Sequence, residues 1–147
     1  MPYQLDQSGR LEYTSQDTVL AIANSKKKTI LIKAKEKRFL QQVFRTMGKN
    51  KQYAIRTFSI MIYYLIKTNP PPHLIIDLEY PGWEDNITSE LINLFKRNSR
   101  NFNPHSLEFK AIGKSAEAHW QAYHVFKRKR RPNIIITAKE ILNEVYQ

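Results

Sequence analysis

The chain has 147 residues, 41% of them hydrophobic, and contains no cysteine. Its length and composition are typical of one globular domain, and the lack of cysteine excludes disulfides, thiolate nucleophiles and cysteine-zinc sites. A formal net charge of +11 makes polyanions the expected class of partner.

The first third of the chain is predicted to form an antiparallel meander. Alternating apolar and polar residues and β-branched runs indicate strands at 10–14, 18–23 and 29–33. The turns between them contain Ser, Asp, Asn and Lys. Glu12 lies in the first predicted strand, and Asp17 lies just after it.

Two helices are predicted next. Apolar positions that recur every three or four residues are typical of an amphipathic helix over 35–47, which ends at Gly48. The segment 51–67 is apolar on nearly all sides, which indicates a buried helix. The prolines at 70–72 end this helix, because proline cannot donate a backbone hydrogen bond.

The second half of the chain alternates strands with helices. The near-continuous apolar start of the segment 73–80 predicts a central parallel strand. Apolar spacing predicts helices at 87–95, 116–126 and 137–146, and a further strand at 106–112. Three isoleucines lead into the last helix, which Thr137 is expected to cap.

This order predicts an α/β fold with a five-stranded mixed sheet, three antiparallel strands and then two parallel ones, flanked by helices. We expect one domain over 1–147, with its core at about 10–126 and a helical extension at 132–147. The longest apolar run, near 58–66, is too short to cross a bilayer. Together with the lack of cysteine, this indicates a cytoplasmic protein without a membrane partner.

Two carboxylates stand two residues apart in the predicted strand at 73–80. Asp77 and Glu79 are expected on the same face, because side chains alternate along a strand. Two such charges on an apolar strand repel each other and lose hydration, which is costly. Bound Mg²⁺ or Mn²⁺ would offset this cost. A lysine or arginine brought in by the fold would also offset it and would make the pair structural.

A second candidate element begins where the strand at 106–112 passes through glycine into a helix. Ser115 is expected to cap this helix, and a helix start favours an anionic ligand. Lys114 stands at the start, and His119 follows in the first turns. His119 is a candidate metal ligand or acid–base group, and a packing or surface histidine is the alternative.

The charge is unevenly distributed along the chain. Eleven Lys and Arg residues lie within 26–56, against Glu36 as the one acid there, and five more follow at 127–131. The segment 68–95 has five acids and no Lys or Arg. Each basic block alone could be a solvated surface, but two blocks around an acidic middle favour a nucleic-acid partner.

Phosphate contacts are predicted for eleven basic residues: Lys26, Lys27, Lys28, Lys35, Arg38, Lys114, Lys127, Arg128, Lys129, Arg130 and Arg131. Trp83, Trp120 and Tyr123 are candidates for stacking on unpaired bases. Aromatic residues near a helix are more often part of the core, which is the alternative for these three.

The strand order, the acid pair after the long helix and the sequence GKSAEAHWQA at the terminal helix resemble the ribonuclease H-like superfamily, nearest to RuvC-type Holliday-junction resolvases. The resemblance implies a nuclease that acts on DNA or RNA with two Mg²⁺ or Mn²⁺ ions. A homodimer is one of the oligomeric states that it allows. Its ligands come from the first strand, the fourth strand and the closing helix. The resemblance therefore implies Asp77 or Glu79, His119, and either Glu12 or Asp17 as the first-strand acid.

Two other functions remain open. The same fold with a basic surface but no catalysis would be a nucleic-acid-binding module. Glu108, Phe109 and Lys110 match the E-x-K pattern of restriction-endonuclease-like nucleases, with Asp77 as the upstream acid. That group uses adjacent antiparallel strands, whereas a helix is predicted between Asp77 and Glu108.

Overall fold

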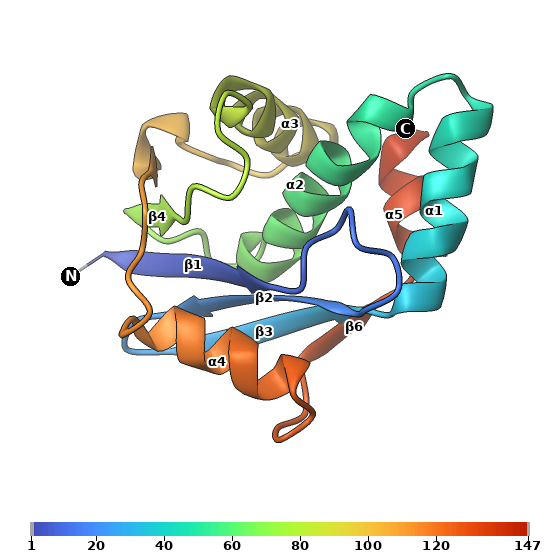
Figure 1. The fold of residues 1–147 in the computed structure, drawn as a ribbon. Helices are drawn as coiled ribbons and strands as arrows, with labels where there is room; N and C mark the ends of the chain where they lie inside the picture. The colour runs from blue at the N-terminus through green and yellow to red at the C-terminus, as the bar shows by residue number, and fades with distance from the viewer. Residues whose placement is uncertain (1, 147) are drawn as a thin grey trace.

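The computed structural model describes residues 2–146, and a mixed sheet of six strands runs through the middle of them (Figure 1). Residues 1 and 147, the ends of the predicted domain, lie outside the described range. The strands are β1 (Tyr3–Ser8), β2 (Thr18–Ala23), β3 (Lys27–Ile32), β4 (Leu74–Ile76), β5 (Leu107–Phe109) and β6 (Ile134–Ile136). Their spatial order is β5-β4-β1-β2-β3-β6. β1, β2 and β3 pair antiparallel, and β4, β5 and β6 join them in parallel pairs.

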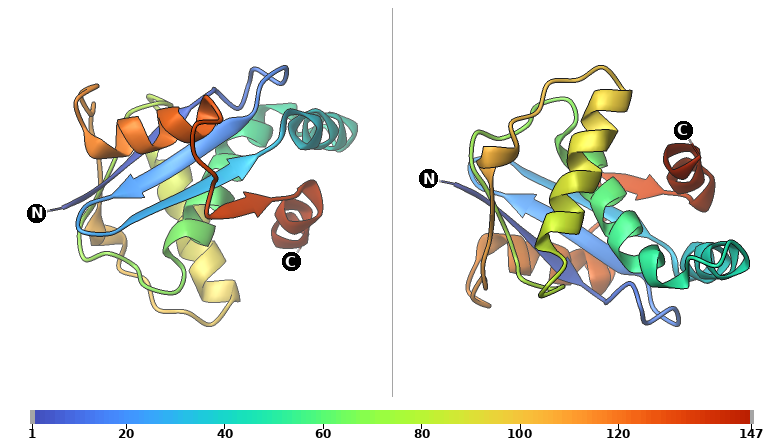
Figure 2. Two further views of the ribbon diagram at one scale, coloured as in Figure 1. Left: turned by 90° about the horizontal axis from the view of Figure 1, so that it is seen from below. Right: turned by 90° about the horizontal axis from the view of Figure 1, so that it is seen from above.

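Helices cover the two faces of the sheet unequally (Figures 1 and 2). α4 lies alone on one face, whereas α2 and α3 cover the opposite face with α1 and α5 beside α2. The bounds are α1 (Ala34–Thr46), α2 (Tyr53–Ile66), α3 (Glu84–Arg97), α4 (Glu117–Phe126) and α5 (Ala138–Val145). None of the helices within residues 2–146 is both long enough and apolar enough to cross a membrane.

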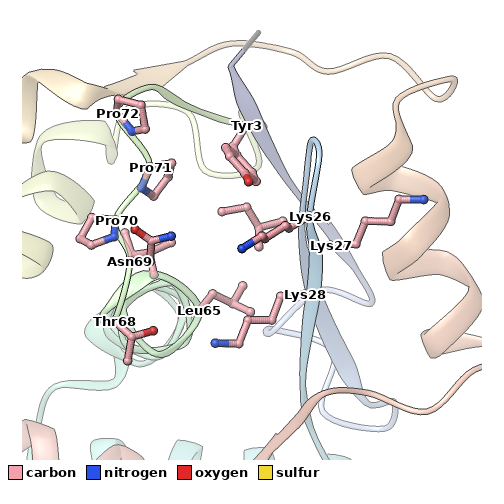
Figure 3. Close-up of a pocket in the computed structure, with 12 residues that line it drawn as sticks. Tyr3, Lys26, Lys27, Lys28, Leu65, Thr68, Asn69, Pro70, Pro71 and Pro72 are labelled. Carbon is pink, nitrogen blue, oxygen red and sulfur yellow. The ribbon is translucent and has the colours of Figure 1, made fainter.

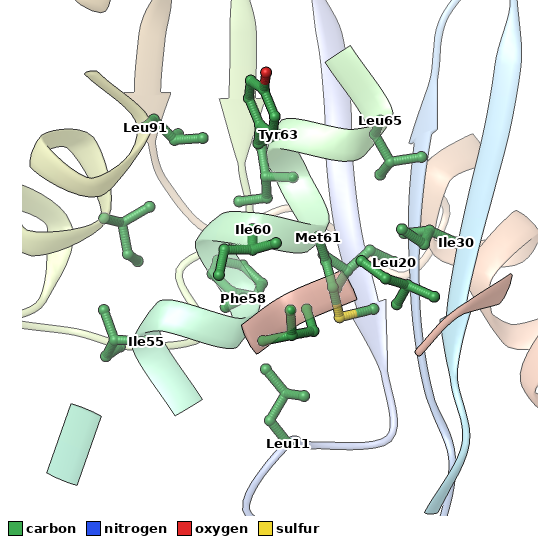
Figure 4. Packing of buried hydrophobic residues seen from close by; sticks show 14 of the residues in the cluster. Leu11, Leu20, Ile30, Ile55, Phe58, Ile60, Met61, Tyr63, Leu65 and Leu91 are labelled. Carbon is green, nitrogen blue, oxygen red and sulfur yellow. The ribbon is translucent and has the colours of Figure 1, made fainter. Parts of the chain in front are cut away.

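The main core lies between the sheet and α2 (Figure 4). Phe58, Ile60 and Met61 of α2 are at most 1% exposed, and Leu20 and Ile30 of the sheet are 0% exposed. A helix that is apolar all round loses most contact with water only when other elements surround it. The prediction of a buried helix over 51–67 is confirmed, and it occupies Tyr53–Ile66.

The first strand differs most from the prediction. β1 precedes the predicted strand, and residues 10–14 form a loop. Gly9 ends β1 with a φ of +75°, and a Cβ atom there would clash with the Asp17 carbonyl oxygen and the Phe126 ring. Only glycine meets both constraints. Although β1 contains no β-branched residue, it is central, because β2 and β4 pair on its two sides.

The C-terminal segment adds a strand that the prediction did not count. β6 pairs with β3, so the region 132–147 contributes to the sheet and is not only a helical extension. Thr137 caps α5 as predicted, in a reciprocal capping box with Glu140. The prediction of five strands is therefore wrong by one, because a three-residue strand gives little sequence signal. The cluster of buried apolar side chains extends from Leu5 of β1 to Ile141 of α5.

A buried lysine holds the loop between β1 and β2. Lys37 on α1 is 0% exposed, and burial lowers its pKa to about 8. Its Nζ donates to the carbonyl oxygens of Arg10, Tyr13 and Gln16 at 3.0, 2.8 and 2.7 Å. Thr18 Oγ1 lies 2.8 Å from the same nitrogen. These contacts fix a loop that has no regular structure of its own.

We expect Lys37→Met to lower the free energy of unfolding by about 2–4 kcal/mol, because three partly buried carbonyl oxygens and the Thr18 hydroxyl lose their donor. Lys35→Met on the exposed side of the same helix is the matched control and should change it by less than about 0.5 kcal/mol. Chemical denaturation of both variants measures the difference. Equal effects in the two variants would contradict this role for Lys37.

Candidate metal centre

The pairing of β1 with β4 brings two aspartates together. Leu5 lies opposite Ile76 in this parallel register, and the Asp77 N–H donates to the Leu5 carbonyl oxygen at 2.9 Å. The next residue of each strand is an aspartate, so Asp6 stands beside Asp77. Leu5 faces the main core, and Asp6 therefore points to the α4 side of the sheet, because side chains alternate.

Glu79 completes a cluster of three carboxylates. β4 ends at Ile76, so Asp77 and Glu79 follow the strand instead of lying within it, and the Glu79 N–H donates to the Asp77 carbonyl oxygen at 2.8 Å. One carboxylate oxygen from each of Asp6, Asp77 and Glu79 lies within 4.8 Å of the others. We call these three residues the acid cluster. Sequence reasoning found two of them and missed Asp6.

Burial makes the acid cluster electrostatically unfavourable when all three groups are ionised. The Asp6 side chain is 6% exposed and that of Glu79 is 18% exposed. Burial, followed by the hydrogen bond and charge of Asp77, raises the pKa of Glu79 to about 8. Burial also raises the pKa of Asp6, and the negative charge of Asp77 raises it further. Hydrogen bonds from the Gln7 N–H and from His119 lower it, but by less. The site therefore favours added positive charge or bound protons.

One arginine supplies part of that positive charge. Arg10 Nη1 donates to Glu79 Oε2 at 3.1 Å, and Arg10 Nη2 donates to the Glu79 carbonyl oxygen at 3.1 Å. Arg10 Nε also donates to Glu12 Oε2 at 2.9 Å, so one guanidinium is shared between two glutamates. The arginine partner considered from sequence is thus present for Glu79. Arg10 forms no ion pair with Asp6 or Asp77.

His119 meets the acid cluster from α4. Its Nδ1 lies 2.9 Å from Asp6 Oδ2, and its side chain is 26% exposed. With Asp6 ionised, Nδ1–H is the donor, which leaves Nε2 as the ring nitrogen that could contact a ligand. The ligand atoms that lie within 4.8 Å of one another belong to Asp6, Asp77 and Glu79, without His119. His119 was predicted to be a metal ligand. In the described part of the chain it hydrogen-bonds to Asp6, so it is placed to orient that carboxylate.

The two residues predicted as the first-strand acid lie elsewhere. Asp17 Oδ1 accepts from the Ala34 N–H at 2.9 Å at the start of α1. Glu12 accepts from the Tyr80 hydroxyl at 2.9 Å as well as from Arg10. Asp17 is therefore not part of the acid cluster, because the predicted first strand is a loop and Asp6 on β1 takes this place.

The E-x-K alternative does not fit the geometry. Glu108 lies 3.0 Å from His73 Nε2 and 3.4 Å from Lys110 Nζ, and it is not among the carboxylates of the acid cluster. β4 and β5 pair in parallel, whereas the E-x-K group uses adjacent antiparallel strands. This alternative is therefore set aside.

The predicted phosphate-binding residues lie in separate places. Lys26 and the first residues of β3 border a pocket of about 420 Å³ opposite Pro70, and Lys26 and Lys28 face it (Figure 3). Lys27 points away and lies 2.8 Å from Glu117 Oε1. Lys35 and Arg38 lie on α1, at the other end of β3 (Figure 1).

The remaining basic residues flank α4. Lys114 is exposed in the loop before this helix, and Ile112 in the same loop donates its N–H to Asp77 Oδ1 at 2.7 Å. Residues 127–131 follow α4 and are all exposed. The structure thus places basic residues at both ends of the helix that carries His119.

The donor set of the acid cluster fits a hard divalent cation. Mg²⁺ and Mn²⁺ prefer carboxylate oxygens, and a dication is the simplest way to hold three carboxylates within 4.8 Å. Arg10 forms an ion pair with Glu79 but with neither Asp6 nor Asp77 of the acid cluster. Asp6, Asp77 and Glu79 are the residues that would hold the cation.

Comparisons with known proteins give no relative from which the role of this site could be taken. No family model, no curated protein and no solved structure matches the chain. The function of the acid cluster is therefore argued from its own geometry and chemistry.

The pKa of Glu79 leads to a test on stability. The pKa of Glu79 rises from 4.5 to about 8 on folding. Between these two pH values the folded protein holds a proton that the unfolded chain has lost, so the free energy of unfolding falls as the pH rises. Glu79→Gln removes this loss. Relative to wild type, it should gain about 1–3 kcal/mol between pH ~5 and pH ~8, measured by denaturation.

Asp85→Asn, at an exposed acid of α3, is the control and should show no such gain. Mn²⁺ added at pH ~8 should raise the melting temperature of wild type and leave Glu79→Gln nearly unchanged. The same Mn²⁺ shift in both proteins would contradict a cation held by Glu79.

Proposed function

We propose that this protein is a divalent-metal-dependent nuclease of ribonuclease H-like fold, which hydrolyses phosphodiester bonds in DNA or RNA. The observation that carries the proposal is the acid cluster, three carboxylates within 4.8 Å of one another on β1 and just after β4 in a protein with a net charge of +11. Three adjoining acids in a basic protein, Asp6 buried and the other two partly buried, favour a role in binding cations, because such a cluster otherwise lowers stability.

The order of the elements supports the ribonuclease H-like part of the proposal. Three antiparallel strands are followed by helices, a parallel strand, a helix, a parallel strand and α4. The acid cluster draws on the first strand and the end of the fourth, and α4 brings His119 to it. These are the three places from which the resemblance draws its ligands. β6 and α5 are additions to this plan.

The chemistry divides among the residues of the site. A bound Mg²⁺ or Mn²⁺ would supply Lewis acidity and lower the pKa of its water. Asp6, Asp77 and Glu79 would hold the cation, and the hydrogen bond from His119 would fix the orientation of the Asp6 carboxylate. Lys114 lies in the loop whose Ile112 N–H donates to Asp77, and in this proposal it would contact a phosphate of the substrate.

A nucleic-acid-binding module without catalysis is the second candidate. Arg10 favours it, since its contact with Glu79 at 3.1 Å gives the cluster one counter-charge from the protein itself. In that case the acids and Arg10 form a structural network, and the basic surface alone binds nucleic acid. The two candidates differ in whether metal-dependent cleavage occurs.

Cleavage assays with Mg²⁺ or Mn²⁺ on branched, single-stranded and hybrid substrates test the proposal directly. We expect Asp6→Asn and Glu79→Gln each to lower the rate by at least about a hundredfold, because each removes a charged ligand. His119→Ala should lower it by about 10–100-fold, the usual range for a residue that orients a ligand.

Binding of the same substrates in Ca²⁺ should be retained by Glu79→Gln, because the basic residues are unchanged. Affinity should fall steeply with added salt. Retained binding with lost cleavage supports the nuclease. Absence of metal-dependent cleavage by the wild-type protein on every substrate type would favour the module.

A further inference from the structure

The outer side of α4 carries four aromatic rings in mutual contact. The Trp120 ring centroid lies 5.7 Å from that of His119, 6.0 Å from Tyr123 and 5.7 Å from His124. Tyr123 and His119 are nearly parallel, with their planes 10° apart and their centroids 6.4 Å apart. Three- and four-residue spacings make Tyr123 a neighbour of His119 and of Trp120, and His124 a neighbour of Trp120, on the helix surface. We call them the α4 ring cluster.

The α4 ring cluster lies at the surface. The side of α4 that packs on the sheet is formed by Ala118, Gln121, Ala122 and Val125, which are buried. Trp120 on the other side is 44% exposed. A tryptophan contributes most to stability when it is buried, so an exposed one within a group of rings is typical of a binding surface.

The α4 ring cluster and the acid cluster adjoin each other. His119 belongs to the first through its contact with Trp120 and touches the second through Asp6 at 2.9 Å. One side chain therefore separates the exposed tryptophan from a carboxylate of the acid cluster. A chain-like ligand lying on Trp120 would reach the acid cluster with its neighbouring unit.

The charges around α4 select an anionic ligand. Lys127 Nζ lies 5.7 Å from the Tyr123 ring centroid, and the Arg128 side chain is 86% exposed. Lys114 is exposed before the start of the helix. Flat rings beside cations fit a ligand with apolar ring faces and repeated negative charges. In nucleic acid, only unpaired bases offer their ring faces, because paired bases are stacked inside the duplex.

We propose that the α4 ring cluster stacks on unpaired bases and directs a single-stranded stretch of DNA or RNA to the acid cluster. This deepens the proposed nuclease function and depends on it for the reaction. The stacking itself requires no catalysis and can be measured separately.

The chain has two tryptophans, which makes the stacking directly observable. In the Trp83→Phe variant all tryptophan fluorescence comes from Trp120. Titration with an oligothymidylate of about 12 nucleotides, without divalent metal, should quench this fluorescence, and a duplex of the same length should not. Trp120→Ala should weaken binding of the oligothymidylate by about tenfold or more, and Trp120→Phe should retain most of the affinity.

Trp83 was also predicted to stack, but the structure places it before α3, in a separate pocket with Lys51 and Arg56, and not in the α4 ring cluster. Because Trp83 is 40% exposed, Trp83→Ala is the matched control. It should leave the affinity unchanged. Equal quenching by duplex and single strand, or unchanged affinity in Trp120→Ala, would overturn the proposal. Circular dichroism of each variant shows whether it is folded, and Trp120→Phe keeps the test valid if the alanine variant is not.

The outcomes separate stacking from catalysis. If the nuclease proposal is wrong and the stacking is right, Trp120 is quenched by the single strand while no substrate is cleaved. If the stacking is wrong and the nuclease proposal is right, cleavage of single-stranded substrate proceeds equally well in Trp120→Ala and Trp83→Ala.

Discussion

The contact between Asp6 and Asp77 determines how the candidate site is arranged. Pairing of β1 with β4 in the register Leu5 opposite Ile76 makes this contact unavoidable, because the next residue of each chain segment is an aspartate. Glu79 then enters the same space from the end of β4. The backbone hydrogen bonds of the sheet hold these carboxylates together, although they would separate in solution. A bound cation would replace their mutual repulsion by attraction to a shared positive charge.

The loop between β1 and β2 links stability to the site. Lys37 fixes the loop through three carbonyl oxygens, one of them that of Arg10. The Arg10 side chain in turn reaches Glu79 and Glu12. In this arrangement Arg10 is a counter-ion built into the protein, and a divalent cation would compete with it for Glu79. The same geometry thus accounts for the nuclease proposal and for the alternative of a structural network.

Much of the fold could be predicted from sequence because its signals are local. The all-round apolar pattern of α2 and the cap at Thr137 depend on near neighbours, and Asp77, Glu79 and His119 were found by their place at predicted element ends. Asp6 was missed because the first strand was predicted at 10–14, where apolar Leu11 and Tyr13 alternate with polar residues more clearly than the residues of β1 do. The strand character of β1 comes from pairing with two distant strands. An aspartate following Leu5, with Gly9 as a strand end, is the signal that could have identified it.

The central claim is that Asp6, Asp77 and Glu79 hold a divalent cation. A crystal structure of the protein soaked in Mn²⁺, with anomalous diffraction data, tests this most directly. We predict an anomalous peak bounded by oxygens of these three carboxylates, at about 2.0–2.4 Å from them, with Arg10 displaced from Glu79. Saturating Mn²⁺ without a peak at this place, and with the contact between Arg10 and Glu79 intact, would contradict the account.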